Sequence, residues 1–258
     1  ALANNIKRIG AKSLEAINRI LTGAGKADGV EKGREVRIDS TVVESNIHHP
    51  TDSSLLYDSV RVLSRILGAN RLRFTNHCRR AKRRMMAVIN ARKQKQRVAA
   101  YKDLLKVTAK TVGYAQPGIE QLEQRGDLQS LAACMELKRF ACLATRVMEQ
   151  CRRRLIEGQT VPAAEKVVSI FEEHTDIIIK DSRDTHYGHK ICLTGGASNL
   201  ILDCLITEGN PADSDLTLPM LDRQKDIYGR YPLKASFDGG FASKDNLKKA
   251  KSRKIKDV

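Results

Sequence analysis

The chain has 258 residues and contains 46 Lys and Arg against 30 Asp and Glu, so its formal net charge is +16 at pH 7. Such an excess favours a polyanionic partner, either nucleic acid or an acidic membrane surface. No apolar run approaches the roughly 20 residues of a membrane-spanning helix, and residues 1–10 lack the apolar core of a signal peptide, so the composition favours a cytosolic protein that faces nucleic acid.

The N-terminal part is predicted to contain one helix and one strand. Residues 4–22 place apolar side chains at helical spacing, and the glycine-containing segment 23–29 interrupts that pattern. In residues 35–45, EVRIDSTVVES, apolar and charged residues alternate up to Asp39, and β-branched residues follow it. This pattern predicts a strand that passes through Asp39.

The middle of the chain is predicted to be helical. Its apolar residues recur with helical spacing, and serines stand where they can cap the first helix. The predicted helices are 53–67, 71–106, 128–158 and 161–174. Residues 113–118, which include Pro117, are predicted to form a turn, so that the second and third helices make an antiparallel hairpin.

The second predicted helix, residues 71–106, carries most of the excess charge. It contains thirteen Lys and Arg and a single acid, Asp103, a net charge of +12. Like charges at i,i+4 repel, and contacts with DNA phosphates would relieve that repulsion and release counterions. We predict binding to the DNA backbone without base readout, the alternative being a solvated helix face. The predicted DNA-binding residues are Arg79, Arg80, Lys82, Arg83, Arg84, Arg92, Lys93, Lys95 and Arg97.

The C-terminal part is predicted to alternate strands and helices. Residues 187–196 and 199–209 read as two strands of a hairpin joined through a Gly-Gly-Ala-Ser segment. A helix over 210–229 follows, although its Pro219 is unfavourable inside a helix. The strand in 232–243 ends on Asp238, and then come a predicted helix over 243–253 and the start of a further strand at 255–258.

The six cysteines show no C-x-x-C pair and no paired spacing. Most have apolar neighbours in the sequence, which favours buried, reduced thiols over disulfides or a zinc site.

Two predicted strands end on an aspartate, Asp39 and Asp238. Carboxylates on adjacent strands can hold two divalent ions about 3.5–4 Å apart, and magnesium suits such a site. Taken singly, Asp39 can instead form an Asx turn and Asp238 an Asp-Gly turn. Their occurrence together in one β–α pattern, beside a strongly basic insertion, favours the metal site.

Four segments carry a resemblance to a known family. They are DSTVVESNIHHPTDSSLL (39–56), YGHKICLTGGASNLILD (187–203), EGNPADS (208–214) and SFDGGFASKDNL (236–247). They resemble the DDE-type insertion-sequence transposases, whose catalytic domain has the RNase H-like fold. In that family the first strand carries the first catalytic Asp and the fourth strand ends on the second. The resemblance implies that Asp39 and Asp238 are these two catalytic residues and hold two Mg²⁺ (or Mn²⁺) ions.

The implied function is metal-dependent DNA cleavage and strand transfer during transposition. The family's third acid, a Glu on a later helix, has no matching position here, because Asp245 and Asp257 follow Asp238 too soon. Its preceding helix-turn-helix is also missing, so both ends are expected to be cuts in a longer protein, and this fragment is expected to be inactive alone. The alternatives are a transposase remnant that only binds DNA and an RNase H-like nuclease.

The histidine-containing loop after the first strand has two interpretations. His48, His49 and Asp52 could line the active site, or they could form a polar loop in which Asp52 caps the next helix. His186 and His189 are expected to be polar surface or edge residues rather than metal ligands.

Together these predictions describe an α/β protein: an RNase H-like mixed sheet with a long all-helical insertion between its first and second strands. The predicted domains are an N-terminal helix and linker (1–34), the first strand and active-site loop (35–51), the helical insertion (52–180) and the remainder of the core (181–258). The expected partners are double-stranded DNA, both transposon ends and target, and a second copy of the chain. The expected location is the bacterial cytoplasm, associated with the nucleoid.

Overall fold

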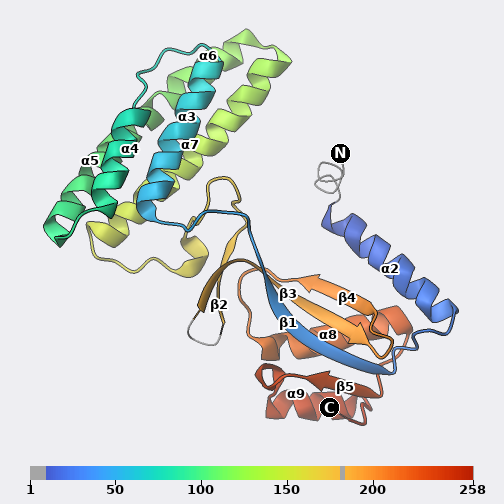
Figure 1. Cartoon of the computed structure of the whole chain (residues 1–258). Coiled ribbons are helices and arrows are strands. Elements are labelled where there is room, and N and C mark those ends of the chain that lie inside the picture. The colour runs from blue at the N-terminus through green and yellow to red at the C-terminus, as the bar shows by residue number, and fades with distance from the viewer. Residues whose placement is uncertain (1–9, 181–183, 258) are drawn as a thin grey trace. The chain divides into compact units, whose positions relative to one another are not determined.

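The computed structural model describes residues 10–180 and 184–257, and the chain divides into two compact units (Figure 1). The sheet unit comprises Ala1–Glu44 and Asp176–Val258, and the helical unit comprises Ser45–Thr175. The chain therefore leaves the sheet unit once, after its first strand, and returns once. Both boundaries lie a few residues before those predicted from the sequence.

A mixed five-stranded sheet forms the sheet unit. Strand β1 (Glu35–Glu44) pairs antiparallel with β3 (Asp184–Gly196) on one side and parallel with β5 (Lys234–Phe237) on the other. Strands β2 (Asp176–Lys180) and β4 (Ile201–Ile206) both pair antiparallel with β3. The predicted β3–β4 hairpin and the α/β class are confirmed, whereas β2 was not predicted.

Alternation along β1 explains which side chains reach the core. Val36 and Ile38 are buried, while Arg37 between them is exposed. Successive side chains of a strand point to opposite faces, so Asp39 lies on the face opposite Ile38. On the buried side, helix α8 (Asp213–Tyr228) packs against β3 and β4.

Three described helices belong to the sheet unit: α2 (Ala11–Ala27), α8 and α9 (Lys244–Ser252). Part of the predicted first helix, residues 4–9, lies outside the described residues. The prediction that residues 23–29 interrupt this helix is wrong for its first part, because α2 continues to Ala27. Contacts with β4 offset the poor helix propensity of glycine: Asn18 Nδ2 donates to the Leu202 carbonyl at 3.0 Å, for example.

The helical unit contains five α-helices, with their shared core at 0–7% exposure. They are α3 (Asp52–Ala69), α4 (Cys78–Ile89), α5 (Gln94–Gly113), α6 (Ala115–Arg125) and α7 (Leu128–Leu155). The single basic helix predicted over 71–106 is wrong, because α4 and α5 are separate helices that pack against each other. The predicted turn at 113–118 is also largely helical, with Pro117 in the first turn of α6, where its missing N–H costs little.

The short helix predicted over 161–174 is wrong as well. Only Ala163–Glu165 forms a single 3₁₀ turn. Side chains take the backbone donors that a helix would have used: the Val167 N–H donates to Gln150 Oε1 at 2.8 Å, and the N–H groups of Phe171 and Glu172 donate to Ser169 Oγ at 3.1 Å. These side-chain acceptors offer the backbone an alternative to helix.

All six cysteines are free thiols, and their burial differs. Burial raises the pKa of Cys151 and of Cys192 to about 12, whereas Cys142 is exposed. Because the thiolate is the reactive form, we expect a short pulse of iodoacetamide at neutral pH to modify Cys142 but neither buried thiol. Mass spectrometry of the labelled peptides measures this. Modification of Cys192 as fast as Cys142 would show that the sheet opens readily.

Candidate active site

The two predicted catalytic aspartates follow the last matched pair of two neighbouring strands. Strands β1 and β5 are parallel, and their register ends with Ile38 opposite Phe237. Asp39 and Asp238 are the next residue on each strand, so their backbones lie side by side at the same end of the pair. This is the arrangement that the sequence predicted for a shared site.

Both carboxylates are accessible to solvent. The side chain of Asp39 is 49% exposed, and its Oδ2 lies 3.8 Å from Arg37 Nη2 on the same face of β1. Asp238 is exposed and caps the 3₁₀ turn Gly239–Phe241, where its Oδ1 accepts the Gly240 N–H at 3.0 Å. The Asp-Gly turn is therefore real, and Asp238 Oδ2 takes no part in this hydrogen bond.

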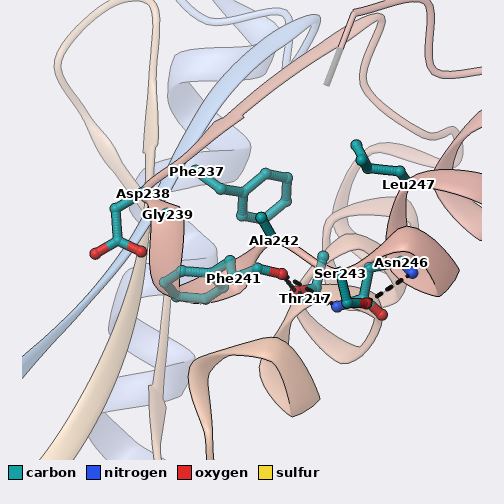
Figure 2. A pocket seen from close by; sticks show the side chains of 9 residues that line it. All are labelled: Thr217, Phe237, Asp238, Gly239, Phe241, Ala242, Ser243, Asn246 and Leu247. Atoms are coloured by element: carbon teal, nitrogen blue, oxygen red, sulfur yellow. Dashed lines mark hydrogen bonds between the residues drawn. The ribbon is translucent and has the colours of Figure 1, made fainter.

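Figure 2 shows the pocket on one side of Asp238, of about 200 Å³. The Asp238 carboxylate points away from the rings of Phe237 and Phe241, whose centroids are 5.5 Å apart. Deeper in the pocket, Asn246 Nδ2 donates to the Ser214 carbonyl at 2.7 Å and lies 3.0 Å from Thr217 Oγ1. The polar groups of this pocket bond to one another, so its role is to hold the turn after Asp238.

A second cavity, of about 180 Å³, borders Asp238 and Gly240 on another side. It contains Ser40, Lys190 and Asp213, none of which the sequence analysis singled out as site residues. Asp213 lies in the segment EGNPADS, so the resemblance pointed to the segment without indicating a role for that carboxylate.

The loop after β1 belongs to the helical unit. Thr51, not Asp52, is the N-cap of α3, and it forms a capping box with Ser54. Asp52 is 6% exposed, and its oxygens accept hydrogen bonds from Gln150 (2.9 Å) and Arg154 (2.7 Å) on α7. These contacts favour a structural role at the start of the helix over an active-site role. His48 Nε2 lies 3.4 Å from Asp58 Oδ2 of α3, and His49 also has an interaction partner.

The two histidines of β3 face carboxylates on neighbouring strands. His186 Nδ1 lies 2.8 Å from Glu44 Oε1, and His189 Nδ1 lies 3.6 Å from Asp176 Oδ2. Within residues 10–180 and 184–257, no three His, Cys, Asp or Glu side chains are gathered closely enough to hold one metal ion.

All nine predicted DNA-binding residues are exposed, but they fall into two groups. Arg80 and Arg84 of α4 both form ion pairs with Asp103 of α5. Burial alone would raise the pKa of Asp103, but hydrogen bonds from the two arginines outweigh it and lower that pKa below its ordinary value. The expectation that the basic segment lacks salt bridges is therefore wrong for this pair.

The second group includes a stripe on the same helix. Arg79, Lys82 and Arg83 are spaced i, i+3 and i+4 on α4, so they share one face of the helix. None of them has a carboxylate partner among the described residues. We call these three residues the basic stripe.

Comparison with protein-family models, curated proteins and solved structures gave no match to this chain. Among the helices of residues 10–180 and 184–257, none is both long and apolar enough to cross a membrane.

Proposed function

We propose that this protein is a DDE-type transposase with an RNase H-like catalytic core, which cuts DNA and transfers the cut strand with the help of divalent metal ions. The observation that carries the proposal is the register of β1 and β5, which brings Asp39 and Asp238 side by side at one end of two parallel strands. Two accessible carboxylates in this position fit the first two catalytic acids of the family.

The order of the strands supports the RNase H-like core. The first strand is central, antiparallel to β3 and parallel to β5, and the helical unit follows β1 as the resemblance requires. Asp238 ends the fifth described strand rather than the fourth, because β2 adds a short strand beside β3. Beyond β5, Asp257 forms a parallel bridge with Lys234, which supports the predicted further strand.

The residues that would hold divalent ions are Asp39 and Asp238. Carboxylate oxygens are the hard donors that Mg²⁺ and Mn²⁺ prefer, and both side chains are open to solvent and to a large substrate. When bound, such ions activate water and stabilise the charge that develops on phosphodiester oxygens. The chain itself supplies the orientation: the β1–β5 register sets Asp39, and the Gly240 N–H fixes the turn at Asp238.

The basic residues of α4 and α5 would bind the DNA backbone. Their contacts carry no sequence information, so they would serve transposon ends and target DNA alike. A second candidate function is DNA binding without cleavage, which the basic stripe favours because it needs neither aspartate. A second subunit and a location at the bacterial nucleoid belong to the same proposal.

We expect Asp39→Asn and Asp238→Asn each to lower strand transfer by about a thousandfold or more while leaving DNA binding nearly unchanged. Asn keeps the size of the side chain but removes the charge that attracts the ions. Strand transfer is measured with Mg²⁺ or Mn²⁺ in a form of the protein that is active, and Mn²⁺ binding is measured on this chain by electron paramagnetic resonance.

Asp245→Asn is the matched control, because Asp245 is an exposed carboxylate of the same unit that pairs with Lys249 at 2.6 Å. This variant should behave like the unmodified protein in both assays. Strand transfer that persists in Asp39→Asn would exclude the proposed catalytic pair.

A further inference from the structure

The cavity beside Asp238 contains a buried ammonium group. Lys190 of β3 is 7% exposed, and its Nζ lies 2.7 Å from Asp213 Oδ1 and donates to the Pro211 carbonyl at 2.7 Å. A charged group that deep in a protein requires charged and hydrogen-bonding partners, and Lys190 has both. The electrostatic environment of this cavity therefore stabilises a cation.

Asp213 connects the cavity to the strand ends. It is the first residue of α8, where the helix dipole favours a negative charge. Its Oδ1 accepts the Ser40 hydroxyl at 2.7 Å, which ties α8 to the residue that follows Asp39 in β1. The sequence does not indicate this contact, because Ser40 and Asp213 are 173 residues apart.

Asp213 and Asp238 approach each other across Gly240. A Cβ at position 240 would lie 3.1 Å from Asp213 Oδ2 and 3.3 Å from Asp238 Oδ1. Two carboxylates so close repel each other unless a cation lies near them. The nearby ammonium of Lys190 is the protein's own cation at this place.

We propose that Asp213 is a third carboxylate of the Asp39–Asp238 site, and that Lys190 neutralises it until a divalent ion takes its place. This inference rests on the proposed function. Asp238 is the shared member, because it neighbours Asp39 through the strand register and Asp213 across Gly240. The described carboxylates are not yet gathered around one position, so binding an ion requires the ammonium of Lys190 to leave Asp213.

The competition between Lys190 and a divalent ion gives opposite effects for its two partners. An opposite charge within a few ångströms changes proton binding to a carboxylate about tenfold or more, and a metal ion responds to the same field. We therefore expect Lys190→Met to tighten Mn²⁺ binding by about tenfold and Asp213→Asn to weaken it by about tenfold. Lys190→Arg keeps the charge and should leave the affinity near that of the unmodified chain.

The experiment measures free Mn²⁺ by electron paramagnetic resonance in solutions of the intact 258-residue chain, with Mg²⁺ as the competitor. Protection of the buried Cys192 thiol checks that each variant is folded. Asp245→Asn is again the control for the loss of one negative charge. If Lys190→Met does not fold, Asp213→Glu replaces it: both substitutions at position 213 disturb the Lys190 contact, but only Glu keeps a carboxylate and should retain more Mn²⁺ binding than Asn.

Two other results separate this inference from the proposed function. If Asp213→Asn binds Mn²⁺ as well as the unmodified chain while Asp39→Asn and Asp238→Asn bind it weakly, Asp213 is a structural partner of Lys190 and the inference is wrong. If none of the three Asp→Asn substitutions changes Mn²⁺ binding, the proposed metal site itself is wrong.

Discussion

Replacing the whole basic stripe, Arg79, Lys82 and Arg83, with glutamine is expected to weaken binding to duplex DNA by about tenfold or more at low salt. The three side chains are exposed on one face of α4 without carboxylate partners, so their charges are available to phosphates. The slope of log K against log salt should flatten by up to about 0.9 for each phosphate that the variant no longer neutralises. Because the stripe would touch the DNA backbone, affinity should fall similarly for unrelated DNA sequences.

The control is a second triple substitution that removes the same charge. Lys138, Arg139 and Arg152 of α7 are about half exposed, but each pairs with a glutamate. Changing these three to glutamine should leave both affinity and salt slope nearly unchanged. Equally weakened binding in the two triple variants would show that DNA responds only to the net charge of the helical unit, and would return the stripe to an ordinary solvated face.

Arg80 and Arg84 are excluded from the test because they hold Asp103. Their ion pairs join α4 to α5, so their removal would leave the partly buried carboxylate without partners and loosen the two helices. Weaker DNA binding in such a variant would have two explanations.

Gly188→Ala is expected to destabilise the sheet unit by about 3 kcal/mol, the upper end of the range for overpacked sites. Gly188 lies in β3 opposite Glu44 of β1. A Cβ there would stand 2.0 Å from the Val43 carbonyl oxygen and 2.7 Å from the Glu44 Cα. Backbone atoms inside a sheet cannot rotate away as a side chain can, so β1 and β3 would have to separate.

Gly195→Ala is the matched control on the same strand. It faces Arg37 of β1, and the nearest atom to its added Cβ, the Arg37 carbonyl oxygen, would be 3.9 Å away. Denaturant unfolding followed by the reactivity of the buried Cys192 thiol reports on this unit alone, since the chain has no tryptophan. If the two variants were equally stable, the register of β1 against β3, and with it the position of Asp39, would be wrong.

The sequence alone was sufficient for the features that depend on near neighbours. Alternation of apolar and charged residues predicted β1, and two glycines between β-branched runs predicted the β3–β4 hairpin. The α8 and α9 helices were also predicted, because their periodicity and capping residues are local. The same local patterns identified Asp39 and Asp238 as strand-final carboxylates. Their resemblance to a known family made them candidate catalytic residues.

The tertiary structure decided every feature that depends on distant partners. Contacts with β4 let α2 run through its glycines, and Gln150 and Ser169 took the donors of a helix expected over 161–174. Packing of α4 on α5 separated the arginines bound to Asp103 from the basic stripe on the same helix. These outcomes are set by strand register and helix packing, which bring together residues far apart in the chain. For the same reason, only the folded chain could bring Asp213, Lys190 and Ser40 together beside Asp238.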